Sequence, residues 1–88
     1  LYIFDLDKSR SNELKHGINF VEAQAIWDDP YMIEWPAHSN EEPRRAITGA
    51  FDGKLWTAIV TQRENTIRII SVRRARKNEA QNYFSGRI

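Results

Sequence analysis

Residues 45–72 read RAITGAFDGKLWTAIVTQRENTIRIISV, and this stretch decides the fold. It holds three segments rich in β-branched and aromatic residues, at 45–51, 55–62 and 66–72, which are typical of strands. Asp52-Gly53 is a tight-turn signal between the first two, and Glu64-Asn65 separates the second from the third. The stretch therefore predicts an antiparallel meander of three strands.

The chain before the meander begins with a short strand and a helix. Leu1–Phe4 has the composition of a strand, and Asp5 after it suits a helix N-cap. We expect the helix to run to about His16, because Gly17 then takes the position after the last turn, where glycine commonly ends helices.

A second helix is indicated by Asn19 and Glu22, which have the spacing of a capping box. Apolar residues then recur at helical spacing on one face, namely Phe20, Ala23, Ile26 and Trp27. The run Asp28-Asp29-Pro30 ends this helix, because the residue before a proline disfavours helical geometry.

The remaining segments add a strand and a helix. Tyr31–Trp35 is a strand by composition, Pro36 ends it, and the polar run His38–Pro43 is a loop. After Ser71, residues spaced three and four apart predict a C-terminal helix. We therefore expect one α+β domain over residues 1–88, with two N-terminal helices, an antiparallel sheet of about four strands and a C-terminal helix.

Composition excludes several classes of protein. Of the 88 residues, 41% are hydrophobic and 28% are charged, which is the balance of a folded globular chain. The absence of cysteine removes disulfides, thiolate metal ligands and cysteine nucleophiles. His16 and His38 have no metal-ligand spacing, so we expect neither a metal nor a cofactor. Without a secretory signal or a membrane-length apolar run, a cytoplasmic location is expected.

Charge is distributed unevenly along the chain. The total is +1, but residues 1–62 carry −4 and residues 63–88 carry +5. Four cations stand at the predicted start of the last helix, where they oppose the helix dipole unless an anion binds there. The cluster predicts a site for a polyanion, above all RNA, and the alternative is a solvated, salt-bridged face. Its members are Arg63, Arg68, Arg73, Arg74, Arg76 and Lys77.

A polar stripe on the first predicted helix is the second candidate site. Its members are three and four residues apart and share one helix face, namely Asp5, Lys8, Asn12 and Lys15, with His16 beside them. Such a stripe either lines a site or faces solvent, and the spacing leaves both open.

Both groups of residues belong to a pattern that resembles BrnT-type toxins. The first half of the pattern is Asp5-x-x-Lys8-x-x-x-Asn12-x-x-Lys15-His16-Gly17, then Phe20-x-Glu22-Ala23 and Asp29-Pro30. The second half is Glu42 near Arg44, Gly49, the run Ile67–Ala75 (IRIISVRRA), Glu79 and Tyr83. Three residues depart from the family: Phe4 in place of a tryptophan, Pro43 within an acidic run, and Val72 in place of an alanine.

The resemblance implies a compact RelE-like fold and the toxin half of a bacterial type II toxin–antitoxin pair. Members of the family are ribonucleases that block translation. The resemblance therefore implies RNA cleavage, and cleavage without a metal. The resemblance also implies a cognate DNA-binding antitoxin that neutralises the toxin, often in complexes of higher order.

Metal-free RNA cleavage requires a deprotonated 2′-hydroxyl, a neutralised pentacoordinate phosphate and a protonated 5′-oxygen. We predict Arg63 and Arg73 at the scissile phosphate, because a guanidinium can hold two phosphate oxygens. Lys8 is predicted as an electrostatic helper, and the candidate proton carriers are, in order, His16, Lys15 and Tyr83. The flanking phosphates are assigned to Arg44, Arg68, Arg74 and Arg76. Glu79 either orients a catalytic arginine or pairs with Arg76.

Two other functions stay open from the residues alone. One is a non-catalytic nucleic-acid-binding module, and the other is an interaction domain whose basic cluster meets an acidic peptide. Cleavage of RNA in EDTA that is lost in Arg63→Ala and Arg73→Ala would distinguish the ribonuclease from both.

Overall fold

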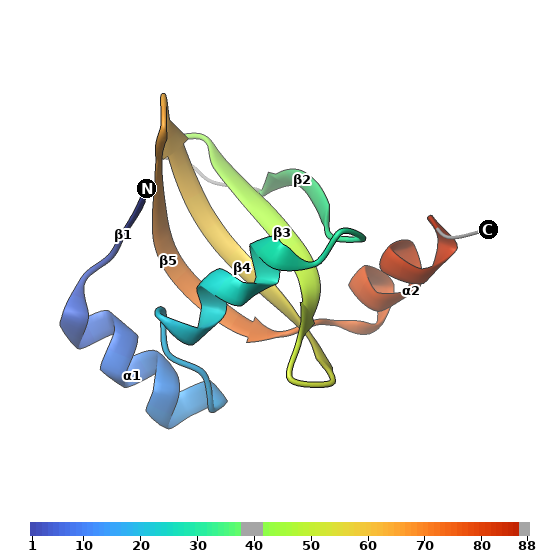
Figure 1. Ribbon diagram of the computed structural model, residues 1–88, viewed down its shortest axis with the longest axis horizontal. Helices are drawn as coiled ribbons and strands as arrows, with labels where there is room; N and C mark the ends of the chain where they lie inside the picture. Colours follow the sequence, from blue (N-terminus) through green and yellow to red (C-terminus); the bar gives the residue numbers. More distant parts are fainter. Residues whose placement is uncertain (38–41, 87–88) are drawn as a thin grey trace.

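The computed structural model describes residues 1–37 and 42–86. Its five-stranded sheet has the order β1-β5-β4-β3-β2, and helices pack against it (Figure 1). The α+β class is confirmed. Among residues 1–37 and 42–86, the helices lack the length and the apolar composition of a membrane span. The elements are β1 (Tyr2–Ile3), α1 (Leu6–His16), the 3₁₀ helix η1 (Glu22–Asp28), β2 (Ile33–Ala37), β3 (Arg44–Phe51), β4 (Lys54–Arg63), β5 (Thr66–Arg74) and α2 (Lys77–Ser85).

The predicted meander is confirmed, because β3, β4 and β5 pair antiparallel in succession. Asp52 and Gly53 have positive φ angles of 54° and 73°, as the central residues of a type I′ hairpin turn require. The register of β5 against β4 shifts at Ile59/Val60. This bulge lets Ile69 and Val72 both reach the core, although they are three residues apart.

The sheet differs from the prediction at both edges. β1 pairs parallel with β5, so the sheet is mixed and has five strands instead of about four antiparallel ones. Pro36 does not end β2, which continues to Ala37. β2 is an edge strand, where a proline is tolerated because its missing N–H points away from the sheet. Residues 38–41 of the predicted loop lie outside the described residues.

β5 also runs further than predicted, and the last helix begins only at Lys77. Arg73 and Arg74 pair with β4, and the N–H of Ala75 still donates to the carbonyl of Leu55 at 2.9 Å. Pairing with a neighbouring strand thus overrides the local helical spacing after Ser71. Two arginines predicted at the start of the helix therefore lie on the sheet.

α1 has the predicted ends. The Asp5 carboxylate accepts from the backbone N–H groups of Asp7 and Lys8 at 2.8 and 3.1 Å. Gly17 takes the left-handed conformation with φ of 80°, and its N–H donates to the carbonyl of Glu13. Both ends depend on hydrogen bonds within a few residues, which is why the sequence predicts them well.

A polar residue fixes α1 to β5. The side-chain amide of Asn12 donates to the carbonyls of Ile18 and Val72 at 2.8 and 2.9 Å. Its oxygen accepts from the N–H of Val72 at 3.1 Å, so Asn12 imitates a strand partner at the outer edge of β5. Asn12 therefore has a structural task within the predicted polar stripe.

The second helix keeps its predicted cap but not its form. The side chain of Asn19 accepts from the N–H of Glu22, whose carboxylate accepts from the N–H of Asn19. Residues 22–28 then wind as a 3₁₀ helix instead of an α-helix. The segment is short and stops before Pro30, and a helix of so few turns takes the form that its packing dictates.

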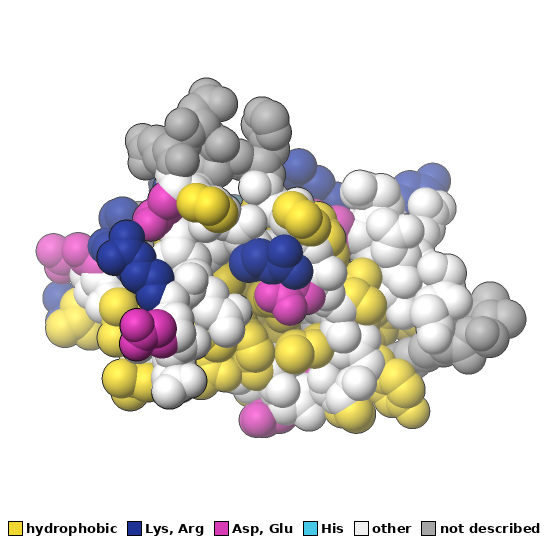
Figure 2. Space-filling view, turned by 90° about the horizontal axis from the view of Figure 1, so that it is seen from above, with side chains coloured by type: hydrophobic (Ala, Val, Ile, Leu, Met, Phe, Trp, Pro, Cys, Tyr) yellow, Lys and Arg dark blue, Asp and Glu magenta, His cyan; other side chains and the backbone are white. Residues whose placement is uncertain are grey.

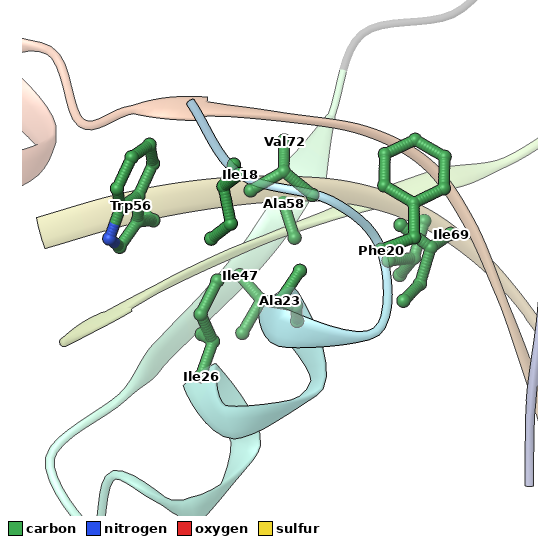
Figure 3. Packing of buried hydrophobic residues seen from close by; sticks show 10 residues of the cluster. Ile18, Phe20, Ala23, Ile26, Ile47, Trp56, Ala58, Ile69 and Val72 are labelled. Carbon is green, nitrogen blue, oxygen red and sulfur yellow. The ribbon is translucent and has the colours of Figure 1, made fainter. Parts of the chain in front are cut away.

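The core lies between one face of the sheet and the segment 18–28 that crosses it (Figure 3). Strand side chains alternate between the two faces, so the neighbours of core residues face the other side. α2 packs near β3. The register turns polar and basic side chains to the second face, among them Thr57, Thr61 and Arg68. The core comprises Ile18, Phe20, Ala23, Ile26, Ile47, Trp56, Ala58, Val60, Ile69 and Val72.

Replacing Gly49 with alanine is expected to destabilise the fold by about 1–3 kcal/mol. A Cβ at Gly49 would lie 2.9 Å from Cγ2 and 3.0 Å from the carbonyl oxygen of Ile26, so η1 would have to move off β3. Urea unfolding measures the change. Gly86→Ala is the control, since its Cβ would meet nothing closer than 3.8 Å. Equal losses in the two variants would contradict this explanation.

Candidate functional site

The basic cluster predicted from the last third of the sequence does not form one patch. The register places Arg63, Arg68 and Arg73 on the sheet face away from the core. Arg74 faces the core side, where its Cζ lies 5.6 Å from the centre of the Trp56 ring. Arg76 is the N-cap of α2, beyond the end of β5. The structure therefore does not bring Arg74 and Arg76 together with Arg63 and Arg68.

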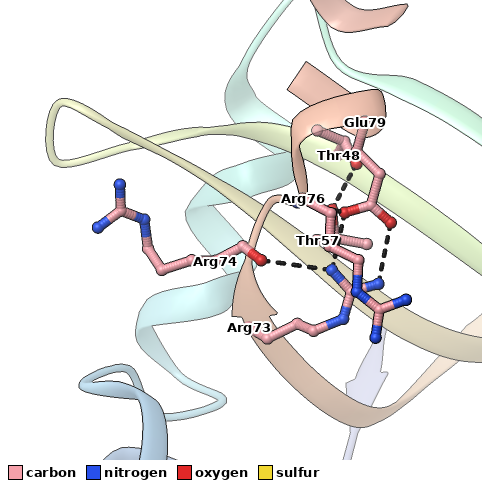
Figure 4. Close-up of polar contacts among 6 residues, drawn as sticks. All are labelled: Thr48, Thr57, Arg73, Arg74, Arg76 and Glu79. Atoms are coloured by element: carbon pink, nitrogen blue, oxygen red, sulfur yellow. Dashed lines mark hydrogen bonds and ion pairs between the residues drawn. The ribbon is translucent and has the colours of Figure 1, made fainter. Parts of the chain in front are cut away.

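Arg73 is held in place by Glu79 of α2 (Figure 4). Nη1 and Nη2 of Arg73 donate to the two carboxylate oxygens at 2.7 and 2.9 Å. The same carboxylate accepts from the hydroxyl of Thr57 at 2.9 Å and from the backbone N–H of Arg76 at 2.8 Å. The side chain of Glu79 therefore pairs with Arg73 and not with the side chain of Arg76. Arg76 contributes only its backbone N–H.

This network shifts the pKa of both charged groups. The hydrogen bonds from Arg73 lower the pKa of Glu79 to about 2, against the opposing effect of burial. The hydrogen bonds with Glu79 raise the pKa of Arg73. Both groups are therefore charged near neutral pH, and Arg73 has no free pair of terminal nitrogens with which to hold a phosphate.

A groove follows β5 and is built of three hollows that share lining residues. The first, near the β4–β5 turn, is lined by Ile3, Glu42, Thr61, Arg63, Thr66 and Arg68. The central one, between α1, β3 and β5, is lined by Asp5, Lys8, Glu42, Arg44, Arg68, Ile69 and Ile70. The third, along α1, is lined by Lys8, Ser11, Asn12, Lys15, His16, Ile70 and Ser71. We call the three together the β5 groove.

The β5 groove unites residues that the sequence separated into an N-terminal stripe and a C-terminal cluster. They meet because α1 packs along β5. The groove holds two carboxylates against five cations, a formal charge of +3 in a chain whose total is +1. The predicted site residues that line it are Lys8, Lys15, His16, Arg44, Arg63 and Arg68.

The central hollow gathers cations from three separate elements. Lys8 comes from α1, Arg44 from the start of β3 and Arg68 from β5. Within the described ranges, none of the three forms an ion pair. In the described part of the chain, Nε of Arg44 is also buried without a hydrogen-bond partner, and an unsatisfied buried donor costs about 1–3 kcal/mol. Unpaired like charges beside an unsatisfied donor are typical of a site that binds an anion.

Glu42 is a member of the groove to which the sequence assigned no role. It lines the first and the central hollow, and its Oε2 lies 3.5 Å from Nη2 of the exposed Arg63. A carboxylate among cations can accept a proton from a substrate hydroxyl. The signal in the sequence was its place two residues before Arg44. Ser11 and Ser71 also line the groove without having been predicted.

Tyr83 lies apart from the groove. It is 2% exposed, and its hydroxyl donates to Oδ2 of Asp29 at 2.6 Å. The same oxygen accepts from the N–H of Ala50 at 2.8 Å, so Asp29 ties α2 and β3 together. α1 and α2 lie at opposite ends of the molecule (Figure 1), and Tyr83 is therefore not brought together with Lys15 and His16.

Acidic side chains accompany basic ones elsewhere on the surface. In Figure 2, the Lys and Arg side chains in the foreground lie next to Asp or Glu side chains. Within the predicted basic cluster, Arg63 pairs with Glu42 and Arg73 with Glu79, so the alternative of a salt-bridged face describes these two members. Arg68 forms no ion pair in the described part of the chain.

Comparison with known proteins identifies the family. Its model, described as ribonuclease toxin, BrnT, of type II toxin–antitoxin system, matches residues 4–79, most of the chain. A comparison with curated proteins finds no match. Across residues 1–37 and 42–86, no three His, Cys, Asp or Glu side chains are placed to hold a metal ion. The resemblance seen in the sequence is confirmed, and the chain belongs to the BrnT family, the ribonuclease toxins of type II toxin–antitoxin systems.

Proposed function

We propose that this toxin cleaves RNA in the β5 groove, with the scissile phosphate in the central hollow. The observation that carries the proposal is the convergence of Lys8, Arg44 and Arg68 from three elements on one hollow. A phosphodiester backbone supplies the anion that such a group of cations favours. The neighbouring phosphates would then meet Arg63 at one end of the groove and Lys15 at the other.

In this proposal Arg44 and Arg68 take the place that the sequence gave to Arg63 and Arg73. Both terminal nitrogens of Arg73 are engaged by Glu79. The side chain of Arg63 is 85% exposed at the end of β4, where solvent weakens its interaction with a phosphate. Arg44 is half-buried, and Arg68, although exposed, lines both the first and the central hollow, so the two guanidinium groups converge on one place where a phosphate can meet both.

The proton transfers are assigned to Glu42 and Lys8, because the third remaining ionisable group of the central hollow, Asp5, is engaged as the N-cap of α1. Glu42 takes the proton of the 2′-hydroxyl as its oxygen attacks the phosphorus, and the ammonium of Lys8 gives a proton to the leaving 5′-oxygen. The P–O5′ bond breaks, leaving a 2′,3′-cyclic phosphate and a 5′-hydroxyl. His16 and Lys15 lie in the next hollow and remain candidate proton carriers for a phosphate bound there.

RNA cleavage by the purified chain is expected to persist in EDTA, because the arginines neutralise the charge that a metal would otherwise carry. Gel analysis of a labelled RNA oligonucleotide, with identification of the product ends, makes the measurement. Glu42→Gln should lower the rate more than His16→Ala. Cleavage that disappears in EDTA and returns with magnesium would contradict the proposed chemistry, and the reverse order of the two variants would move the reaction to the third hollow.

We further propose that the cleavage blocks translation in the cytoplasm, and that a cognate DNA-binding antitoxin neutralises the toxin in a complex of higher order. The description of the family as one half of a type II toxin–antitoxin system supports this. Expression of the chain is expected to arrest growth, and co-expression of an adjacent small open reading frame should restore it. Glu42→Gln is the control, and arrest as strong as that of the wild type would show that toxicity does not depend on cleavage.

A further inference from the structure

A further hollow, separate from the three hollows of the β5 groove, lies on the sheet face away from the core and differs from them in its chemistry. It lies between the edge strand β2 and α2 and is lined by Ile33, Glu34, Trp35, Asn78, Glu79, Asn82, Ser85 and Gly86. We call it the β2–α2 hollow. The register turns the side chain of Glu34 to the other face of the sheet, where it pairs with Arg45, and the carboxylate of Glu79 is paired with Arg73. The hollow therefore offers no uncompensated charge and suits a neutral ligand.

The side chains of the β2–α2 hollow combine an aromatic surface with hydrogen-bonding groups. Trp35 is half-buried, and Asn78 and Asn82 are exposed on one face of α2, four residues apart. In the described part of the chain, the side-chain amides of Asn78 and Asn82 have no hydrogen-bond partner. The indole N–H of Trp35 has none there either. An unpaired nucleobase can stack on an indole ring, and side-chain amides can form hydrogen bonds with the edge of the base.

The register of the sheet connects this hollow to the β5 groove. Trp35 pairs with Ala46, Ala46 with Ile59, and Ile59 with Ser71. Directly opposed residues point to the same face, so these four form one row across the sheet. The row ends at Ser71, which lines the groove beside Lys15 and His16. It spans three strand spacings, roughly 14 Å, and carries no charged side chain.

We propose that the β2–α2 hollow binds an unpaired base of the RNA substrate, a few nucleotides from the scissile phosphate, and thereby sets the sequence preference of cleavage. This rests on the proposed cleavage in the β5 groove. The groove contributes charge for the backbone, and the hollow contributes stacking and amide groups for a base. Backbone contacts position a strand and base contacts specify it, so the two surfaces divide the task.

The binding test uses the full chain, labelled with ¹⁵N, and hexanucleotides of RNA that are 2′-O-methylated throughout. Such strands have no free 2′-hydroxyl and are not cleaved. On binding, the indole N–H signal of Trp35 and the side-chain amide signals of Asn78 and Asn82 are expected to shift. Among hexanucleotides that each contain one base only, one should bind at least about five-fold more tightly than the others. Movement of groove signals while these three stay fixed would overturn the inference.

The cleavage test compares two matched variants on a pool of RNA sequences. Asn82→Asp replaces an amide donor in the hollow and is expected to change the preferred base at one position. Gln81→Glu makes the same chemical change on the adjacent exposed residue of α2, outside the hollow, and should leave the preference as it is. An unchanged preference in Asn82→Asp would overturn the inference, as would an equal change in both variants.

The two proposals fail in different ways. A wild-type chain that cleaves no RNA but shows the three shifts would refute the proposed cleavage and retain the base-binding hollow. A chain that cleaves RNA in EDTA without those shifts would refute the hollow alone.

Discussion

Arg68→Ala is expected to lower the rate of RNA cleavage by about 10²–10³-fold, as does the loss of one preorganised group that stabilises transition-state charge. Arg68 lines both the first and the central hollow, and in the proposed mechanism its guanidinium meets the charge that develops on the pentacoordinate phosphate. Because this interaction strengthens only as that charge develops, the loss should appear equally in kcat and in kcat/KM. Single-turnover cleavage of a labelled oligonucleotide isolates the chemical step.

Two further variants make the result specific to the geometry. Arg68→Lys keeps the charge but loses the planar fork, and an intermediate rate is expected. Arg10→Ala removes the same charge from a side chain of α1 that is 78% exposed and lies outside the groove. Its rate should stay within about threefold of the wild type. Equal losses in Arg68→Ala and Arg10→Ala would mean that only overall charge matters, and the central hollow would lose its assigned role.

The fold could be predicted where the responsible contacts are local. The cap at Asp5, the capping box at Asn19 and the turn at Asp52-Gly53 each depend on hydrogen bonds or backbone angles within a few residues. The sequence failed where a distant strand decides. Pro36 stays in β2 because β2 is an edge, and β5 continues to Arg74 because β4 is there to pair with it.

The candidate site shows the same limit in its side chains. Sequence spacing predicted the stripe with Lys8 and Lys15 and the cluster with Arg68, but not that α1 and β5 place them in one groove. Strand alternation sends Arg73 and Arg74 to opposite faces, and the bulge in β5 puts Arg68 and Arg73 on the same face although they are five residues apart. Periodicity in one segment cannot reveal this, because the register is set by the partner strand.

Glu79→Ala is expected to lower the free energy of unfolding by about 3 kcal/mol, the low end of the cost of breaking a buried ion pair. Glu79 is 6% exposed and accepts from Arg73, Thr57 and the N–H of Arg76. Its removal leaves all three donors without this acceptor. The low end applies because the side chain of Arg73 is 23% exposed and water can partly replace the carboxylate. Urea unfolding at pH 7 measures the loss, which is a large fraction of the stability of a small domain.

The dependence on pH identifies the charge of Glu79 as the cause. Its pKa is about 2 in the folded chain and 4.5 ordinarily, so its contribution is present above about pH 4.5 and is lost as the pH falls toward 2. The stability difference between the wild type and Glu79→Gln should therefore shrink between pH 7 and pH 3. Replacing both partners, as in Arg73→Met with Glu79→Leu, should destabilise less than Glu79→Ala, because no unpaired charge remains. A difference that is constant with pH would mean that Glu79 acts through shape and neutral hydrogen bonds instead.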